Sequence, residues 1–268
     1  MDMLDYMIRP GEKPLDRIVP DGGFCGIFRR FAVIGDSLSS GEFEALDGQG
    51  GKTYHDLFEY SWGQYMARAM GSVCHSFSRG GMTAREYMDS FAALRGFWDP
   101  ALAAQMYIVA LGVNDISVAM AEGTGLGSLQ DIRDDWRMNA RTFAGHYGAI
   151  IQRYRLIAPD SKFFLMTIPD DTFDEPPRKA LNAAHRALLQ GMAERFPNTY
   201  LLEFDRYAPV YDEEFHRRFF LNGHLDPAGY LLTARMVMSY IDYIVRARPE
   251  EFAEVGLIGT PYKNHRGE

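Results

Sequence analysis

The sequence predicts an α/β fold built on a parallel sheet, and two observations support this. Five short apolar runs, each followed by polar residues or by Gly and Pro, are typical of buried parallel strands. They cover residues 31–34, 72–77, 106–111, 163–167 and 200–204. Segments with helical spacing of apolar residues lie between the runs, and strands that alternate with helices indicate a parallel sheet covered by helices.

The predicted helices follow in order along the chain. Apolar residues recur at helical spacing over 58–69, another helix opens at Thr83, and two more cover 132–157 and 177–196. The run from Thr83 to Glu86 has the form of a capping box, and Asp226 precedes Pro227 as an N-cap acid precedes a proline in the first turn. The last helix is therefore expected from Pro227 to about Arg246.

Length and composition predict one domain over residues 1–268, with 1–27 and 250–268 as peripheral extensions that wrap the surface or fray. The 268 residues are 47% hydrophobic and 24% charged, which suits a compact globular chain. A formal net charge of -8 disfavours binding to nucleic acid or to an anionic membrane. No apolar run is long enough for a bilayer span, and residues 1–20 carry charges where a signal peptide is apolar, so we expect a cytoplasmic protein.

The two cysteines predict neither a disulfide framework nor a metal site. Cys25 and Cys74 are far apart, with no C-x-x-C pair and no histidine at ligand spacing. Reduced cysteines of this kind suit the cytoplasm and are expected to act as small apolar fillers. No metal and no other cofactor is predicted.

The candidate chemistry lies in loops, because functional residues of an open parallel sheet follow the carboxyl ends of its strands. Ser37 follows the first apolar run, Gly81 the second and Asn114 the third, while His224 lies in a loop before the final helix. A serine hydroxyl needs a base to become a nucleophile, and imidazole has a suitable pKa. The backbone N–H groups of Ser37 and Gly81 and the Asn114 amide could receive the oxyanion of an acyl-transfer intermediate.

These residues resemble the four blocks of the GDSL, or SGNH, hydrolase family. The blocks are Gly-Asp-Ser-Leu at 35–38, Gly81 ahead of Thr83, Gly-Val-Asn-Asp at 112–115, and His224 followed by Leu-Asp-Pro-Ala-Gly-Tyr. The resemblance covers residues 35–230 in the family's order. It implies a three-layer, flavodoxin-like fold and a metal-free serine esterase or lipase. It assigns Ser37 as nucleophile, Gly81 and Asn114 as oxyanion donors, and His224 as base.

One position departs from the family pattern. An aspartate usually stands three residues before the catalytic histidine, whereas this chain has Leu221 there. Substitutes considered from the sequence are a backbone carbonyl near Asn222 or an acid from the following set: Asp212, Glu213 and Glu214. Losing the orienting acid lowers the rate without abolishing catalysis, because the oxyanion hole remains.

Each motif also has a structural interpretation. Ser37 alone would be a turn residue that caps a helix, and Asn114 alone a turn asparagine. Asp115 is expected to make local backbone hydrogen bonds and Asp226 to cap the last helix. Residues 50–53 resemble the end of a phosphate-binding loop, but Leu46 stands where its first glycine would be, so a surface loop is predicted.

The predicted function is hydrolysis of a small carboxylic ester through an acyl-enzyme on Ser37. The acidic chain favours a soluble ester, with a lean toward O-acetyl esters of carbohydrates. The alternatives are a thioesterase or lysophospholipase acting on longer acyl chains, or a non-catalytic ligand-binding protein of the same fold. The expected partner is a small-molecule ester, with neither nucleic acid nor membrane, and the oligomeric state stays open.

Overall fold

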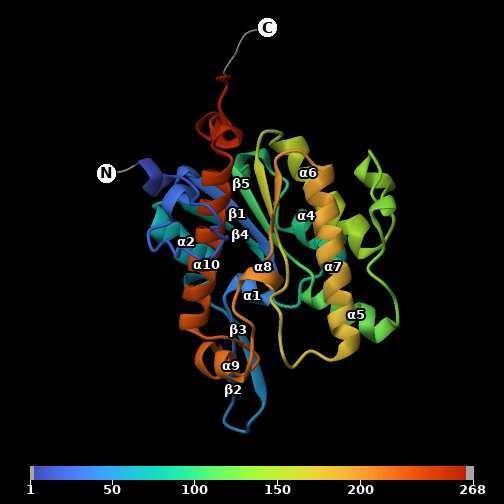
Figure 1. The fold of residues 1–268 in the computed structure, drawn as a ribbon. Coiled ribbons are helices and arrows are strands. Elements are labelled where there is room, and N and C mark those ends of the chain that lie inside the picture. The colour runs from blue at the N-terminus through green and yellow to red at the C-terminus, as the bar shows by residue number, and fades with distance from the viewer. Residues whose placement is uncertain (1–2, 264–268) are drawn as a thin grey trace.

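A five-stranded parallel sheet forms the centre of the molecule (Figure 1). The computed structural model describes residues 3–263. The strand order is β4 (Val73–Ser78), β1 (Arg30–Gly35), β5 (Met106–Ala110), β6 (Lys162–Met166) and β7 (Thr199–Leu202), and every neighbouring pair is parallel. All five apolar runs of the sequence are therefore strands, and the α/β prediction is confirmed.

Helices cover both faces of this sheet, which gives three layers (Figure 1). On one face lie α2 (Trp62–Met70) and α10 (Pro227–Ala247). On the other face lie α5 (Val113–Glu122), α6 (Phe143–Ile157) and α7 (Pro176–Arg195). The helical segment after Thr83 joins the second layer as α3 (Ala84–Glu86), one π-helical turn, and α4 (Ala92–Leu94).

The two cores follow from the two-residue period of the strands. In β1, Ala32 and Ile34 are buried against the layer of α6 and α7, whereas Phe31 and Val33 are buried against α2 and α10. Successive side chains of a strand point to opposite faces, so a strand covered on both sides is apolar throughout. This continuous apolarity is the reason the strands could be recognised in the sequence.

The helix predicted over 132–157 is shorter than expected and begins only at Phe143. Thr142 ends the preceding loop, and its hydroxyl accepts a hydrogen bond from Gly145 N at 3.1 Å, which caps α6. Ile132 is buried because it packs against Gly148 of α6, not because it continues that helix. Apolar spacing alone could not separate these two situations.

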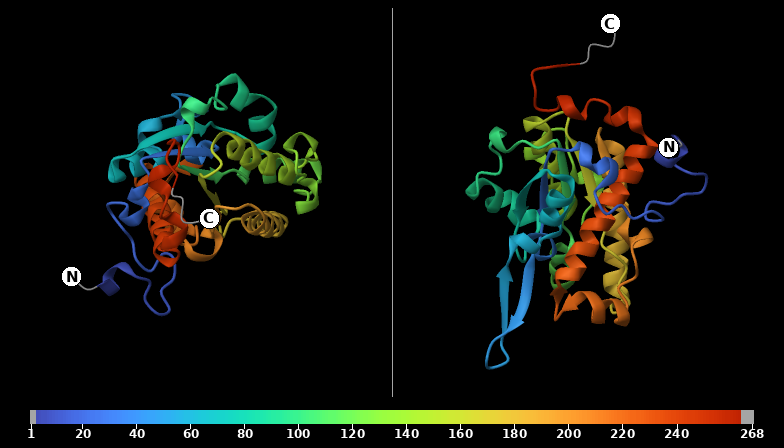
Figure 2. Two further views of the ribbon diagram at one scale, coloured as in Figure 1. Left: turned by 90° about the horizontal axis from the view of Figure 1, so that it is seen from above. Right: turned by 90° about the vertical axis from the view of Figure 1, so that its left-hand side faces the viewer.

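A β-hairpin of β2 (Glu42–Leu46) and β3 (Lys52–Asp56) extends from the lower end of the molecule (Figure 2, right). The surface loop predicted over 50–53 is wrong in part, because Lys52 and Thr53 open β3. The Asp47 carboxylate closes the turn by accepting hydrogen bonds from Gln49 N at 2.8 Å and Gly51 N at 2.7 Å.

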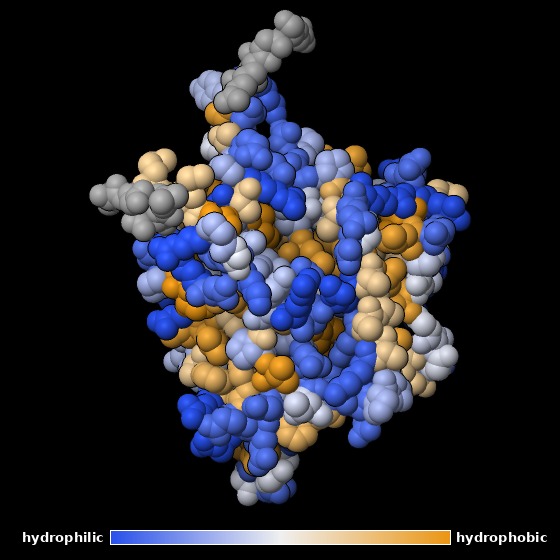
Figure 3. Space-filling view, viewed as in Figure 1, coloured by the Kyte–Doolittle hydropathy of each residue, from blue (hydrophilic) through white to orange (hydrophobic). Residues whose placement is uncertain are grey.

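Short elements complete the lower end of the molecule. They are α1 (Ser37–Ser40), α8 (Phe204–Tyr207), α9 (Glu213–Phe219) and a small antiparallel pair, β8 (Phe220–Leu221) with β9 (His224–Leu225). The carboxyl ends of the sheet strands open toward these elements (Figure 1). Hydrophilic and hydrophobic residues are interspersed over this side of the molecule, and α9 presents mostly hydrophilic ones (Figure 3).

The predicted peripheral extensions contribute to the core within the described residues. Val19 N donates to the Ser239 hydroxyl at 2.9 Å, and Phe24 N donates to the Asp242 carboxylate at 2.8 Å, so the N-terminal segment is held on α10. After α10, Phe252 and Val255 are buried in the same core. Residues 1–2 and 264–268 of the two extensions lie outside the described part.

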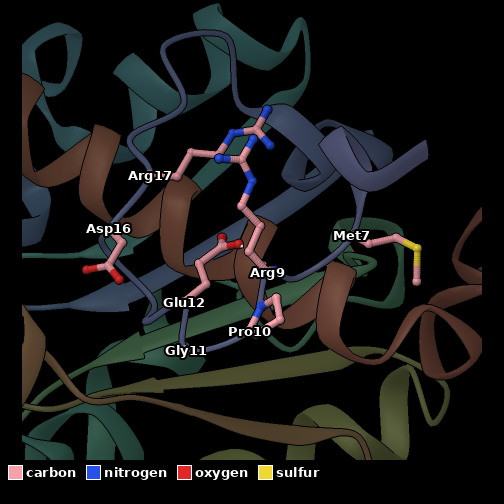
Figure 4. Close-up of a pocket in the computed structure, with 7 residues that line it drawn as sticks. All are labelled: Met7, Arg9, Pro10, Gly11, Glu12, Asp16 and Arg17. Carbon is pink, nitrogen blue, oxygen red and sulfur yellow. Dashed lines mark hydrogen bonds between the residues drawn. The ribbon is translucent and has the colours of Figure 1, made fainter. Parts of the chain in front are cut away.

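A cavity of about 610 Å³ lies within the N-terminal segment (Figure 4). Glu12 points toward its middle, and Arg9 and Arg17 extend side by side at one edge. Glu12 also pairs with Arg246 near the end of α10, whereas His224 precedes the start of that helix. A helix of 21 residues is about 30 Å long, so this cavity is remote from the predicted site.

Candidate active site

Ser37 is the first residue of α1, directly after β1. Asp36 caps this helix, because its carboxylate accepts a hydrogen bond from Leu38 N at 3.1 Å. The Ser37 N–H is among the first four of the helix, which intrahelical bonding leaves free. Its hydroxyl makes no hydrogen bond to another described residue. The turn therefore presents a half-buried serine with both groups available for a substrate.

The two other predicted donors follow the strands on either side of β1. Gly81 lies after β4 with a φ of +70, and Asn114 is the second residue of α5, after β5. The Asn114 Nδ2 group donates to the carbonyl of Met82 at 3.2 Å, which ties these two loops together. Ser37, Gly81 and Asn114 therefore each follow the carboxyl end of one of three adjacent strands.

His185 supports the Asn114 loop, a role that the sequence analysis did not find. This fully buried histidine lies on α7, and its Nε2 is 3.0 Å from the Leu111 carbonyl. Gly112 has a φ of +144, and a Cβ there would lie 2.4 Å from the His185 ring. Burial lowers the pKa of His185 to about 4, so the ring is neutral at pH 7 and its Nε2 donates to the carbonyl.

Two buried carboxyl groups lie behind the donors. Asp115 accepts hydrogen bonds from Ala84 N at 3.0 and 3.2 Å, so its backbone partner comes from the neighbouring loop and not from local residues as predicted. Burial raises the pKa of Asp36 to about 7, and burial together with the charge of Asp36 raises the pKa of Asp115 to about 7. Asp115 therefore joins the start of α5 to the start of α3, whereas Asp36 bonds only within its own turn.

His224 lies on β9, which packs against α1. No hydrogen bond joins its ring to the Ser37 hydroxyl in this structure. The imidazole instead faces β2, with Nε2 3.1 Å from Glu42 Oε1 and Nδ1 3.8 Å from Glu44 Oε2. Burial lowers the pKa of His224, and the Glu44 carboxylate partly opposes this effect. The base form is therefore favoured at neutral pH.

None of the acids predicted as substitutes for the missing aspartate contacts His224. Asp212 caps α9 by accepting from Phe215 N at 2.8 Å, and Glu214 pairs with Arg217 at 2.6 Å. Glu213 is exposed in the first turn of α9. The prediction that one of these three acids orients His224 is therefore wrong. The acids of this segment instead cap α9 and form ion pairs on its surface.

The Asn222 carbonyl, the other predicted substitute, makes no hydrogen bond to His224. Asn222 instead donates its side-chain amide to the Glu44 carbonyl at 2.9 Å. The acids that do face the imidazole belong to β2, a strand that the sequence analysis did not recognise. The alternation of polar and apolar side chains at Glu42, Phe43 and Glu44 is the sequence pattern that could have identified this strand.

Neither a metal-binding cluster nor a membrane-spanning helix occurs among residues 3–263. No group of three or more His, Cys, Asp or Glu side chains there is arranged to hold a metal ion. Within the same range, no helix combines the length and apolar character that a bilayer crossing requires.

A match to a known protein family shows which family this chain belongs to. The GDSL-like lipase/acylhydrolase family matches residues 33–232. The chain belongs to this family. The protein is therefore a hydrolase that acts on ester bonds. No curated protein sequence matches the chain.

Solved structures share the fold of this GDSL-like hydrolase at low sequence identity. A family two carbohydrate esterase from Clostridium thermocellum in complex with cellohexaose has 15% identity and a TM-score of 0.56, over 81% of this chain and 64% of that one. A family 2 carbohydrate esterase from Corynascus, with a carbohydrate-binding domain, has 14% identity and a TM-score of 0.53, over 85% and 67%. LAE5, an alpha/beta hydrolase from the Lake Arreo metagenome, has 17% identity and a TM-score of 0.53, over 81% and 96%.

Proposed function

We propose that this hydrolase is a serine esterase that forms an acyl-enzyme on Ser37, with His224 as base. One observation carries the proposal: an unbonded serine hydroxyl follows β1, Gly81 and Asn114 follow the two neighbouring strands, and His224 lies on β9, which packs on the helix of Ser37. A nucleophile, a base and preorganised donors are the components that acyl transfer requires.

The proposed reaction has two halves. The Ser37 oxygen attacks the ester carbonyl while its proton passes to Nε2 of His224, and the alcohol then leaves with that proton. Water, deprotonated by the same nitrogen, releases the acid and restores Ser37. In both halves the oxyanion is held by the N–H groups of Ser37 and Gly81 and by the Asn114 amide.

His224 must exchange partners for the first step. Its Nε2 now faces Glu42, so the ring has to turn this nitrogen toward Ser37 when substrate binds. Hydrogen bonds of catalytic groups are often loose in an unliganded enzyme and tighten in the complex. The packing of β9 on α1 keeps the required movement local.

The proposed substrate is a short ester of a hydroxylated alcohol and not a long acyl chain. A cavity of about 540 Å³ is lined by Thr83 and Asp115, which stand close in sequence to Gly81 and Asn114. Its wall also carries the charged residues Arg85, Glu86, Asp89 and Arg141. Neither Ser37 nor His224 lines this cavity, so the proposed substrate class rests on the carbohydrate esterases among the structural neighbours, which are consistent with an O-acetyl sugar. The cytoplasmic location stays a prediction.

Release of acid from p-nitrophenyl esters, acetate through octanoate, tests this proposal. We expect the intact chain to hydrolyse acetate fastest and Ser37→Ala to lose at least about 10³-fold in kcat. Ser117→Ala, which removes an exposed hydroxyl on α5, is the matched control and should keep full activity. A fluorophosphonate should label the intact protein but not Ser37→Ala.

Three results would count against the proposal. Full activity of Ser37→Ala would exclude the acyl-enzyme on this residue. Fastest turnover of octanoate would favour the thioesterase or lysophospholipase alternative over the sugar ester. Absence of both turnover and labelling would favour the non-catalytic ligand-binding alternative.

A further inference from the structure

His224 carries a buried nitrogen with no hydrogen-bond partner. Its Nδ1 is shielded from solvent and unbonded. Leu221, at the family's aspartate position, pairs with His224 across the β8–β9 ladder and is 45% exposed, so it offers nothing to this nitrogen. An unsatisfied buried polar atom costs about 1–3 kcal/mol, and in a native structure it calls for a functional explanation.

The carboxylate of Glu44 faces this Nδ1 nitrogen of His224. Its side chain is only 4% exposed, and Oε2 lies 3.8 Å from Nδ1, while Oε1 lies 2.8 Å from Lys52 Nζ. Lys52 therefore holds one carboxylate oxygen and leaves the other directed at the imidazole. A charge-assisted hydrogen bond between Oε2 and Nδ1 needs a separation of about 2.8 Å, so a closure of about 1 Å would form it.

The loop before His224 is shaped around this carboxylate. A Cβ at Gly223 would lie 2.6 Å from Glu44 Oε2, so the glycine leaves space in which this carboxylate oxygen lies. Asn222, in left-handed backbone at a φ of +57, donates its amide to the Glu44 carbonyl at 2.9 Å. Backbone and side chain of Glu44 are thus both fitted to the residues next to His224.

We propose that Glu44 is the positioning residue of His224 and takes the part that aspartate has in other family members. This inference rests on the proposed function of Ser37 and His224. Nδ1–H donates to Glu44 Oε2, which directs Nε2 toward Ser37 and stabilises the imidazolium that forms when the serine proton arrives. Glu44 stays ionised throughout, and the proton stays on the imidazole until the alcohol leaves.

Glu42 does not fit this role, although it is nearer to the ring. It faces Nε2, the nitrogen that has to accept the serine proton, and there it competes with Ser37. Its pKa is raised by burial and by the charges of Asp56 and Glu44. Glu42 and Glu44 therefore make a matched pair for experiment, since both are glutamates on one strand, one half-buried and one buried, that face opposite nitrogens of the ring.

The charged and titratable groups around His224 come from the hairpin. Glu42 and Glu44 face it from β2, while Lys52, Asp56 and the Tyr54 ring face it from β3. The other elements packed on β9 are α1, β8 and α10, and their described residues next to the ring carry no charge. The sequence of α1 is Ser-Leu-Ser-Ser, that of β8 is Phe-Leu, and α10 begins with Pro-Ala-Gly-Tyr. The Asp226 carboxylate accepts a hydrogen bond from Gly229 N at 2.8 Å.

The test compares Glu44→Gln with Glu42→Gln in the full chain, using p-nitrophenyl acetate. We expect Glu44→Gln to lower kcat by about 10²–10⁴-fold with KM nearly unchanged, because the loss is in transition-state stabilisation. Its acid limb should move to lower pH, since removing a nearby negative charge lowers the pKa of an imidazole. Glu44→Asp should recover part of kcat, and Glu42→Gln should lose less than about 10-fold.

NMR titration of the His224 imidazole gives a reading that does not depend on turnover. Glu44→Gln should lower the pKa of His224, whereas Lys52→Met, an exposed change that removes the opposing cation, should raise it. Lys52→Met also keeps the proposal testable if Glu44→Gln does not fold. The pKa of His224 in the wild-type protein is the reference.

The outcomes separate the two proposals. If the wild-type protein turns over ester but Glu44→Gln keeps its kcat, its acid limb and its His224 pKa, the role of Glu44 is refuted and Ser37 catalysis stands. If the wild-type protein neither turns over ester nor reacts with fluorophosphonate, the proposed function fails. The NMR titration then decides separately whether Glu44 positions the ring.

Discussion

Replacing Gly112 by alanine tests the link between the fold and the oxyanion donors. Gly112 has a φ of +144, which L residues rarely adopt, so the new side chain costs about 1–3 kcal/mol in backbone strain. The added Cβ would lie 2.4 Å from Nε2 of His185. That ring is fully buried and bonded to the Leu111 carbonyl, so it cannot yield freely, and overpacking adds about 1–3 kcal/mol.

The free energy of unfolding should therefore fall by about 2–6 kcal/mol. At roughly 3 °C per kcal/mol in a chain of this size, Tm should be lower by about 6–18 °C. Urea denaturation followed by circular dichroism measures the first quantity and a thermal scan the second. Esterase activity at a temperature where the variant is folded should also fall, because Asn114 follows in the displaced turn.

Gly125→Ala is the control, because a Cβ there meets nothing within 4 Å and its φ is not positive. It should change stability by no more than about 0.5 kcal/mol. In a double-mutant cycle, His185→Ala should couple with Gly112→Ala by at least about 1 kcal/mol, since removing the ring makes space for the new methyl group. Equal stability of the Gly112 and Gly125 variants would refute the reasoning.

Three further predictions concern the donor amide, the base and the N-terminal anchor. Asn114→Ala should lower kcat for p-nitrophenyl acetate by about 10²–10³-fold with little change in Tm, and an unchanged kcat would remove it from the oxyanion hole. The pKa of His224 is below the ordinary imidazole value of about 6.5. The value of kcat/KM should therefore be flat from pH 8 to about 6.5 and should fall in more acidic buffer, because the base is protonated there. A decline that begins near pH 8 would contradict the assignment of His224 as base. Arg246→Met should cost about 3–5 kcal/mol in urea denaturation, because its side chain is 2% exposed and its loss leaves Asp242 and Glu12 buried without their partner. Arg248→Met, at 57% exposure, should cost no more than about 1 kcal/mol, and similar losses for the two variants would exclude a role for burial.

The sequence by itself determined the sheet and the four blocks of the site. Each strand is buried on both faces and therefore appears as a continuous apolar run, and each block follows a strand or precedes the last helix within a few residues. These are local signals. The placement of Ser37, Gly81 and Asn114 together follows from them, because the carboxyl ends of neighbouring parallel strands share one edge of the sheet.

Only the tertiary structure decided what surrounds His224. The hairpin of β2 and β3 has mixed polar and apolar residues and is mostly covered on one side, so it gave no continuous run to recognise. Glu44 and Asn222 are 178 residues apart, yet the fold packs β2 against β9 and brings Glu44 Oε2 to 3.8 Å from His224 Nδ1. A contact of this kind depends on how distant elements pack, and no local pattern encodes it.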